Sequence, residues 1–308
     1  MQIWIDNMTV INAMRFSKDS GGMVADSQGS TETRKYDIFD KASLLGDNIL
    51  IGGTGSSSVL GDSGNKLRWI YQKDKTVYQN AVELSKILTD VYRSFIDQEM
   101  RTRFSFGVNE FIAGKLADGT PIGPHIIPSA GELYEGRDRA AAQTRQNAFI
   151  VIGKDAEDCF IYQVPMGGQP YLWPAPFASV GSGQDESDNV LHDFLKSVPR
   201  AGRQEINFVD GMAALIRATN RSSDINKGVG GVPTIAYFTK EASTVLPEED
   251  SLLATEIVKV ADKELVDRHR AMNSLEGLLL RTKSPEDIEL ELFENTPGIM
   301  KFLRGYRS

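Results

Sequence analysis

Thr9 is the residue whose place in the chain raises a chemical question. It follows Met8 directly in the stretch NMTVINAMRF, which has the composition of a first β-strand, so one cleavage between the two residues would make the threonine a chain terminus. A threonine hydroxyl is a poor nucleophile until a base takes its proton, and a free α-amino group can be that base. The amide nitrogen of an internal residue cannot. Thr9 therefore suits nucleophilic chemistry only if the residues before it are removed.

The other reactive side chains do not group into a site along the sequence. Cys159 is the single cysteine, which argues against a disulfide framework and a thiolate metal cluster and favours a reducing, cytoplasmic compartment. The three histidines are scattered, and none has the spacing of a metal ligand: His125, His192 and His269. We therefore expect no metal and no cofactor.

Two glycine clusters, GGTGSSS and GVGGVP, invite comparison with nucleotide-binding loops. A phosphate loop needs Gly-Lys-Ser/Thr at the start of a helix, and neither cluster has it. Glycine also permits tight turns and close approach of backbone segments. We interpret both clusters in this second way, and nucleotide binding is kept only as a third hypothesis.

The composition is that of a globular chain without a nucleic-acid or membrane partner. The 308 residues are 41% hydrophobic and carry a net charge of −8 with no long basic run, which argues against binding to a phosphate backbone. No apolar run approaches the length of a membrane span, and the start, MQIWIDNM, lacks the features of a secretory signal.

The first half of the chain is dominated by strand patterns. TVINAMRF and GMVADSQG predict a hairpin, and KYDIFDKASLLGD and NILIGGTG predict a second strand pair with a turn at residues 46–48. From residue 81 the apolar period is helical, with one face formed by Leu84, Ile87, Leu88, Val91, Tyr92 and Phe95. Residues 100–146 are rich in glycine and proline and predict a long loop or small insertion.

The second half adds strands, a helix pair and a tail. A hairpin is predicted for NAFIVIGKD and CFIYQVPMGG, and a further strand for YLWPAPFASVGSG. Two helices are predicted around DNVLHDFLKSV and DGMAALIRATNR, and a last strand follows them at TIAYFTK. Residues 241–308 predict a helical extension with an apolar face that suggests self-assembly, formed by Leu253, Ile257, Val260 and Ala261. Strand runs interrupted by helix pairs favour antiparallel sheets layered with helices.

Four motifs, in their order and separations, resemble the proteasome β-subunit family of N-terminal nucleophile hydrolases. They span residues 9 to 239 and read TVINAMRF with GGMVADSQGST, DKASLLGDNILIGGTGSSS, FASVGSGQDES, and AALIRATNRSSDINKGVGGVPTIAYF. The resemblance implies an α+β fold, a four-layer αββα sandwich of two antiparallel sheets over residues 9–240. It further implies a leader at residues 1–8, with the helical extension at 241–308.

The same resemblance implies a nucleophile with a charged pair beside it. Thr9 matches the N-terminal threonine that is nucleophile and base together, so residues 1–8 would be removed by autolysis, or translation would start at Met8 and an aminopeptidase would remove that residue. Lys41, 32 residues after Thr9, matches the lysine whose charge favours the alkoxide-like form of the hydroxyl. Asp26, in VADSQ, matches the aspartate that orients and charge-pairs that lysine.

Three further roles follow from the resemblance. Ser182, in VGSGQ, and Asp224, in SSDIN, match the pair that holds the terminal amine. Gly55 matches the glycine whose backbone N–H stabilises the tetrahedral oxyanion, a type of donor worth ~3 kcal/mol in other acyl-transfer enzymes. Gly53, nearby, would leave room at the mouth of a specificity pocket.

Each of these residues also has an ordinary structural interpretation. Thr9 suits a strand because it is β-branched. Lys41 and Asp26 could form a surface pair worth ~0–1 kcal/mol. Ser182 and Asp224 could be turn or helix-cap residues. We favour the functional interpretation because all five polar residues fall where one mechanism needs them.

The chain departs from the family pattern in ways that bear on activity. The interval from Thr9 to Asp26 is one residue longer than usual, whereas the interval to Lys41 fits. The usual serine after the aspartate is missing, and Lys227 stands there, near the expected amine. These departures keep an inactive relative among the alternatives.

The resemblance predicts a threonine-type hydrolase that cleaves peptide bonds through an acyl-enzyme on Thr9 after leader removal. One alternative is a catalytically inactive proteasome-like structural or assembly subunit. Another is a peptide ligase in which an amine, instead of water, takes the acyl group. The expected partners are a peptide or protein substrate and further copies of the chain in a ring or stack, with no nucleic acid and no membrane.

Overall fold

The computed structural model describes residues 9–27, 29–30, 35–36, 41–55, 57–199, 202–203, 205–226 and 229–294. The expected leader, the end of the predicted helical extension from residue 295, and Lys227 lie outside these described residues. Among the described helices, none combines the length and apolar character needed to cross a bilayer.

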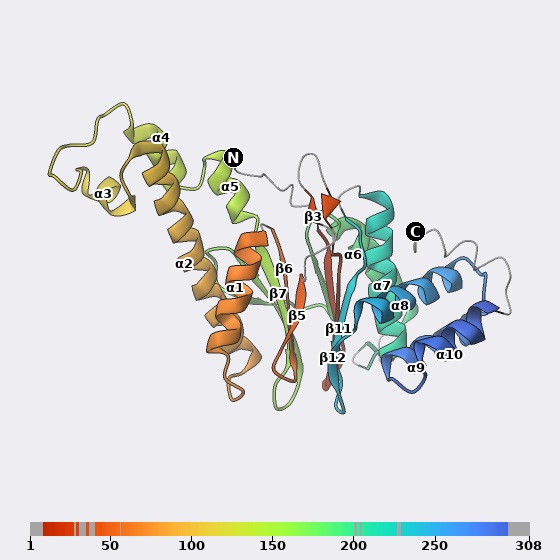
Figure 1. Ribbon diagram of the computed structural model, residues 1–308. Coiled ribbons are helices and arrows are strands. Elements are labelled where there is room, and N and C mark those ends of the chain that lie inside the picture. Colours follow the sequence, from red (N-terminus) through yellow and green to blue (C-terminus); the bar gives the residue numbers. More distant parts are fainter. Residues whose placement is uncertain are drawn as a thin grey trace.

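Two antiparallel five-stranded sheets form the centre of the molecule (Figure 1). The first has the order β10 (Phe177–Val180), β1 (Ile11–Ser17), β2 (Ser20–Ala25), β11 (Thr234–Phe238) and β12 (Ser243–Val245). The second has the order β5 (Ala42–Leu45), β6 (Ile49–Thr54), β7 (Ala148–Lys154), β8 (Cys159–Pro165) and β9 (Tyr171–Leu172). A separate short ribbon pairs β3 (Gly29–Ser30) with β4 (Lys35–Tyr36).

Helices cover the outer faces of both sheets, so the layers run helix, sheet, sheet, helix (Figure 1). The second sheet is covered by α1 (Ser57–Ile70) and α2 (Val77–Phe104). The first sheet is covered by α6 (Gln184–Ser197), α7 (Phe208–Ile225) and α8 (Glu248–Asp262), with α9 (Arg268–Leu279), α10 (Pro285–Glu289) and a π-helical turn (Leu290–Glu294) packed beyond them. The predicted mixture of antiparallel sheets and helix layers is confirmed.

Apolar side chains alternate between the layers along the central strands. In β7, Ile150 and Ile152 belong to the cluster between the two sheets, whereas Phe149 and Val151 belong to the cluster under α1 and α2. Successive side chains of a strand point to opposite faces, so a strand that is buried on both faces is continuously apolar. This is why the stretch FIVI shows no polar alternation and still forms a central strand.

Residues 100–146 form a helical arm that projects from the body (Figure 1). Of the two alternatives predicted there, the long loop is corrected, whereas a small insertion agrees with the arm. The arm consists of the end of α2 with α3 (Val108–Ala113), α4 (Ile127–Tyr134) and α5 (Arg139–Arg145). Part of its glycine and proline content lies at helix ends: Gly107 and Gly114 flank α3, and Pro128 is in the first turn of α4. The rest lies mainly in the non-helical stretch 115–126 between α3 and α4, so only this shorter segment of the predicted loop is a loop.

Two other elements differ from the sequence-based expectation. Helix α1 was not predicted, because its sequence SSVLGDSGNKLRWI contains two glycines and three serines, which have low helix propensity. The predicted strand YLWPAPFASVGSG is divided into β9 and β10, which belong to different sheets. The first residues of the extension also form a strand, β12, beside β11.

The apolar face of α8 is part of the protein's own core. Leu253, Ile257, Val260 and Ala261 are all at least nine-tenths buried, in one cluster with residues of α7 and α9. The prediction that this face binds another subunit is therefore wrong. Self-assembly remains a prediction, and any contact between copies must use another surface.

A close approach between β1 and α7 supplies a test of this packing. A Cβ atom added at Gly211 of α7 would lie 2.4 Å from a ring carbon of Phe16, which is fully buried, whereas one added at Gly64 of α1 would meet nothing within 4 Å. Both positions are helical, so replacement by alanine brings the same gain in helix propensity.

We therefore expect Gly211→Ala to lower the free energy of unfolding by about 1–3 kcal/mol because of the clash. Gly64→Ala should raise it by about 0.5–1 kcal/mol. Urea unfolding followed by circular dichroism measures both values. Equal shifts in the two variants would contradict the described contact between β1 and α7.

Candidate active site

Strand direction brings the predicted site residues to one end of the two sheets. β1 and β11 begin where β2 and β10 end, because these neighbours are antiparallel. In the second sheet, β5 begins where β6 ends. One end of the sandwich therefore contains the residues just before β1 and β5 and the residues just after β2, β6 and β10. These positions include Thr9, Lys41, Asp26, Gly55 and Ser182.

The carboxylate of Asp26 joins the start of β1 to the start of β5. Its Oδ1 accepts the backbone N–H of Val10 at 2.8 Å, and its Oδ2 accepts the Nζ of Lys41 at 2.9 Å and the more distant N–H of Gly230 at 3.5 Å. Asp26 and Lys41 are 1% and 7% exposed. The pair is thus buried between the sheets, which excludes the surface-pair interpretation.

Burial and the attraction between the two charges shift the pKa values of Asp26 and Lys41 in opposite directions. Burial raises the pKa of the Asp26 carboxyl, against the charge and hydrogen bond of Lys41. Burial also lowers the pKa of the Lys41 ammonium, against the charge and hydrogen bond of Asp26. Each ion therefore depends on the other to stay charged in a dry environment.

The backbone of Thr9 is held on both sides by the segment after β10. Its N–H donates to Ser182 Oγ at 3.1 Å, and its carbonyl accepts the N–H of Gly183 at 3.3 Å. A Cβ on Gly181 would lie 2.1 Å from the Thr9 carbonyl oxygen and 3.4 Å from Thr54 Oγ1. Only glycine fits at position 181, which also has a φ of +107°.

Gly55 lies directly after β6, next to Thr54. Its φ is +127°, and a Cβ there would lie 1.8 Å from Asn147 Oδ1, so this position also requires glycine. Thr54 and Thr9 both lie close to Gly181. The turn at Gly55, directly after Thr54, is therefore at the same end of the two sheets as Thr9. Gly53 is an interior residue of β6, and its N–H donates to the Lys41 carbonyl at 2.9 Å.

The structure does not bring Asp224 into contact with Thr9, Asp26, Lys41 or Ser182. Gly55 lies at the same end of the sheets, and the residue against it is Asn147. Asp224 lies in the last turn of α7 with an exposed side chain, and that side chain makes no hydrogen bond to another described residue. The nearby residue of α7 that reaches the site is Ser222, whose Oγ donates to the Gly183 carbonyl at 2.7 Å.

Sequence reasoning missed three backbone or hydroxyl groups of this site: Gly183, Gly230 and Ser222. Gly230 lies in the cluster GVGGVP, and its N–H contact to Asp26 confirms that this cluster allows a close approach of the backbone. Gly183 lies in VGSGQ, where the motif points to Ser182 alone, so its N–H contact to Thr9 was not expected. Ser222 carried no signal, because a serine within a helix is unremarkable until its partner in the fold is known.

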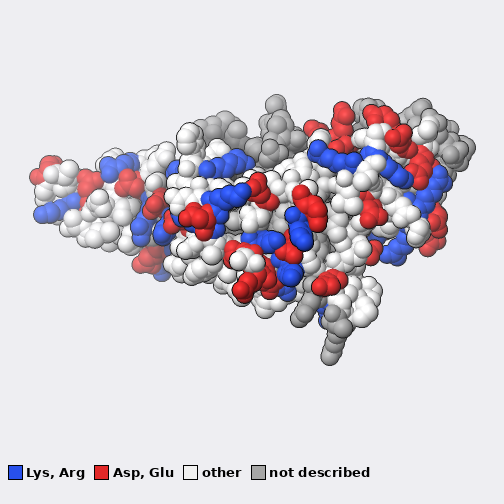
Figure 2. Space-filling model, turned by 90° about the horizontal axis from the view of Figure 1, so that it is seen from below, with Lys and Arg blue, Asp and Glu red and all other residues white. Residues whose placement is uncertain are grey.

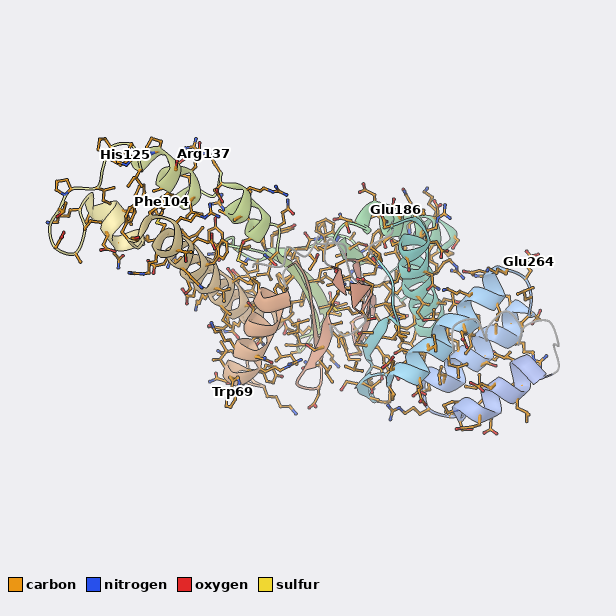
Figure 3. The ribbon with its side chains drawn as sticks, turned by 45° about the horizontal axis from the view of Figure 1, so that its top comes forward. Trp69, Phe104, His125, Arg137, Glu186 and Glu264 are labelled. Atoms are coloured by element: carbon orange, nitrogen blue, oxygen red, sulfur yellow. The ribbon has the colours of Figure 1, made fainter. Side chains whose placement is uncertain are left out.

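The remaining reactive groups lie elsewhere. Cys159 is fully buried between the sheets, and burial raises the pKa of its thiol, so it is unsuited to be a nucleophile. His125 lies on the projecting arm, far from Glu186 at the start of α6 (Figure 3). Within the described ranges, no three histidine, cysteine or acidic side chains group as a metal site.

Two cavities lie away from the predicted residues. One of about 910 Å³ is on the helical arm and is lined by Tyr92, Arg101 and Tyr134. Another of about 780 Å³ is beside the turn between β1 and β2 and is lined by Tyr237 and Arg281 among others. Neither contains a predicted catalytic residue. On the face seen from below, basic and acidic side chains are interspersed, unlike the continuous basic surface that nucleic acids select (Figure 2).

Comparison with known proteins adds no family assignment. No protein-family model matches this chain, and no curated protein matches it.

The buried pair leads to a test based on pH. In Lys41→Met, the carboxylate of Asp26 loses its cation while it stays buried, which should cost about 3–5 kcal/mol of unfolding free energy at pH 8. The pKa of folded Asp26 then lies further above its unfolded value. The folded state therefore binds the proton more tightly, and the deficit should shrink as the pH falls from 8 towards 4.

Lys73→Met is the matched control, because Lys73 and Asp47 also pair at 2.9 Å but are 83% and 76% exposed. Its unfolding free energy should stay close to that of the wild type at both pH values. Urea unfolding at pH 8 and pH 5 gives the comparison. A deficit in Lys41→Met that does not change with pH would mean that Asp26 is not the uncompensated group.

Proposed function

We propose that this chain is an amide hydrolase of the N-terminal nucleophile type, similar to proteasome β-subunits, with Thr9 as its nucleophile once residues 1–8 are removed. The observation that carries the proposal is the set of contacts around Thr9. Its nitrogen lies 3.1 Å from Ser182 Oγ, and the next residue is bound by Asp26, the partner of Lys41. The helix, sheet, sheet, helix layering supports the corresponding fold.

In the proposed reaction, the α-amino group of mature Thr9 takes the proton of its own hydroxyl as Oγ attacks the carbonyl carbon of a peptide bond. The N–H of Gly55 stabilises the oxyanion that forms. The ammonium then gives its proton to the leaving amine, the C–N bond breaks, and an ester to Thr9 remains. Water attacks that ester in a second step and releases the acid.

Ser182 and the buried pair prepare this chemistry. Ser182 Oγ is within hydrogen-bond distance of the Thr9 nitrogen and orients the amine. Lys41 supplies a positive charge that lowers the cost of removing the hydroxyl proton, and its effect is strengthened by burial. Asp26 fixes that charge relative to β1 through its second oxygen.

An inactive structural subunit is the second candidate, and one observation favours it. Asp224, expected to help hold the terminal amine, is exposed and does not contact Thr9. An inactive subunit would still fold around the Asp26–Lys41 pair. Peptide ligation is a variant of the first candidate, because an amine can take the acyl group from the same ester.

The resemblance also implies assembly into a ring or stack of identical subunits, and we retain this as a proposal. The apolar face of α8 is internal, so the contacts would involve other surfaces. Light scattering of the purified protein at micromolar concentration should give a multiple of 34.0 kDa. A mass equal to one chain would contradict assembly without bearing on the chemistry.

Labelling of Thr9 tests the proposed chemistry. A chain that begins at Thr9 should react with a threonine-directed electrophile, detected by intact mass and located by peptide mapping. Thr9→Ser should keep part of the labelling rate because it keeps the hydroxyl. Thr9→Val, of nearly the same volume, should lose it by more than about 1,000-fold, as should the chain that retains Met8.

Thr255→Val is the control for loss of a buried threonine hydroxyl, because Thr255 Oγ1 donates to the Ser251 carbonyl within α8, remote from Thr9 in the sequence and outside the site. It should be labelled at the wild-type rate. Equal labelling of Thr9→Val and the wild type would show that Thr9 is not the nucleophile and would favour the inactive candidate.

A further inference from the structure

Two buried serines lie between α6 and α7, beneath the segment that holds Thr9. Ser187 and Ser222 are fully buried, and their Oγ atoms are 2.8 Å apart. Burying hydroxyl groups costs free energy unless they are hydrogen-bonded, so a buried pair needs partners. The hydrogen-bond partners of the two serines include the turn at Gly183, which contacts Thr9.

The direction of the hydrogen bonds follows from the number of protons. A serine hydroxyl has one proton to donate and two lone pairs to accept with. Ser222 Oγ donates to the Gly183 carbonyl at 2.7 Å, so its contact with Ser187 Oγ at 2.8 Å uses the proton of Ser187. Ser187 Oγ also lies 3.3 Å from the Ala218 carbonyl, and the shorter contact, with Ser222, is the stronger of the two. The hydrogen bonds therefore run from Ser187 to Ser222 to Gly183, and each bond polarises the next.

Gly183 connects this chain to Thr9. Its N–H donates to the Thr9 carbonyl at 3.3 Å while its carbonyl accepts from Ser222. A Cβ on Gly183 would lie 2.9 Å from Ser222 Cβ and 3.1 Å from Val10 Cβ, so the residue is wedged between α7 and β1. The place of Gly183 also sets that of its neighbour Ser182, whose Oγ meets the Thr9 nitrogen.

The ends of the two helices are tied on the outer side of this wedge. Asn226, directly after α7, donates through Nδ2 to Glu186 Oε2 at 3.2 Å. Glu186 is in the first turn of α6, at the top of the helix pair in Figure 3. Two contacts therefore lie next to the Gly183 turn. Ser222 Oγ binds its carbonyl, and the hydrogen bond between Asn226 and Glu186 joins the adjacent ends of α6 and α7.

We propose that Ser222 is a positioning residue for Thr9, acting through Gly183 and Ser182. This inference rests on the proposed function, because positioning matters only if Thr9 reacts. In this proposal α7 positions Thr9 through the buried hydroxyl of Ser222. Asp224, two residues later in the same helix, is exposed to solvent.

The experiment compares Ser222→Ala with Ser85→Ala in the chain that begins at Thr9. Ser85 is a matched control, since its Oγ also donates from a helix to a glycine carbonyl, that of Gly168, at 2.6 Å. Both variants lose one such bond, and their unfolding midpoints should fall by similar amounts. Labelling of Thr9 is measured well below those midpoints.

We expect Ser222→Ala to be labelled at least about tenfold more slowly than the wild type, because a small misplacement of a nucleophile costs rate steeply. Ser85→Ala should keep the wild-type rate. Ser187→Ala leaves the bond from Ser222 to Gly183 in place and removes the contacts of Ser187 Oγ with Ser222 Oγ and the Ala218 carbonyl. Its labelling rate should lie between those of the other two variants, and it should still fold if Ser222→Ala does not. Ser222→Cys, with a weaker donor of similar shape, should recover part of the rate.

The failures of the two proposals are distinguishable. If the wild-type chain beginning at Thr9 is not labelled, the proposed function fails, and the positioning role fails with it. If the wild type is labelled but Ser222→Ala and Ser187→Ala react as fast as Ser85→Ala, only the positioning role is overturned.

Discussion

The carboxylate of Asp26 is bound at once by the start of β1, by Lys41 before β5 and by the loop before β11. The two sheets can face each other at this end only if this buried charge is matched, because an unpaired ion between them would cost several kcal/mol. The same constraint suits the proposed chemistry. The hydrogen bond to Asp26 fixes the position of the Lys41 ammonium, and the role proposed for that charge requires a fixed position.

The rest of the site is assembled by antiparallel topology around that pair. Segments that are far apart in the sequence, before β1 and β5 and after β6 and β10, meet because neighbouring strands run in opposite directions. Glycines at positions 55, 181 and 183 let the backbones approach more closely than a side chain would allow. Helix α7 completes the arrangement from outside, through Ser222 rather than through a charged group.

Much of the fold followed from local patterns. Most strands of both sheets were predicted, because β7 and its neighbours have apolar runs, whereas β12 was not expected and β9 and β10 were predicted as one strand. The contacts of Thr9, Asp26, Lys41 and Ser182 agree with the order of the motifs. The helical arm was missed because glycines and a proline at its helix ends, together with those of the loop at 115–126, give one continuous loop-like composition. Ser222 was missed and Asp224 misplaced for a different reason: the direction of a side chain from a helix end depends on how α6 and α7 pack, which local sequence does not encode.

The proposed chemistry requires Thr9 to be the first residue of the working protein, because only then does the base next to its hydroxyl exist. N-terminal sequencing and intact mass of the protein from its native source test this most directly. The native chain should begin with Thr-Val-Ile-Asn and should have lost residues 1–8. A native chain that begins at Met1 and is not labelled by a threonine-directed electrophile would contradict it.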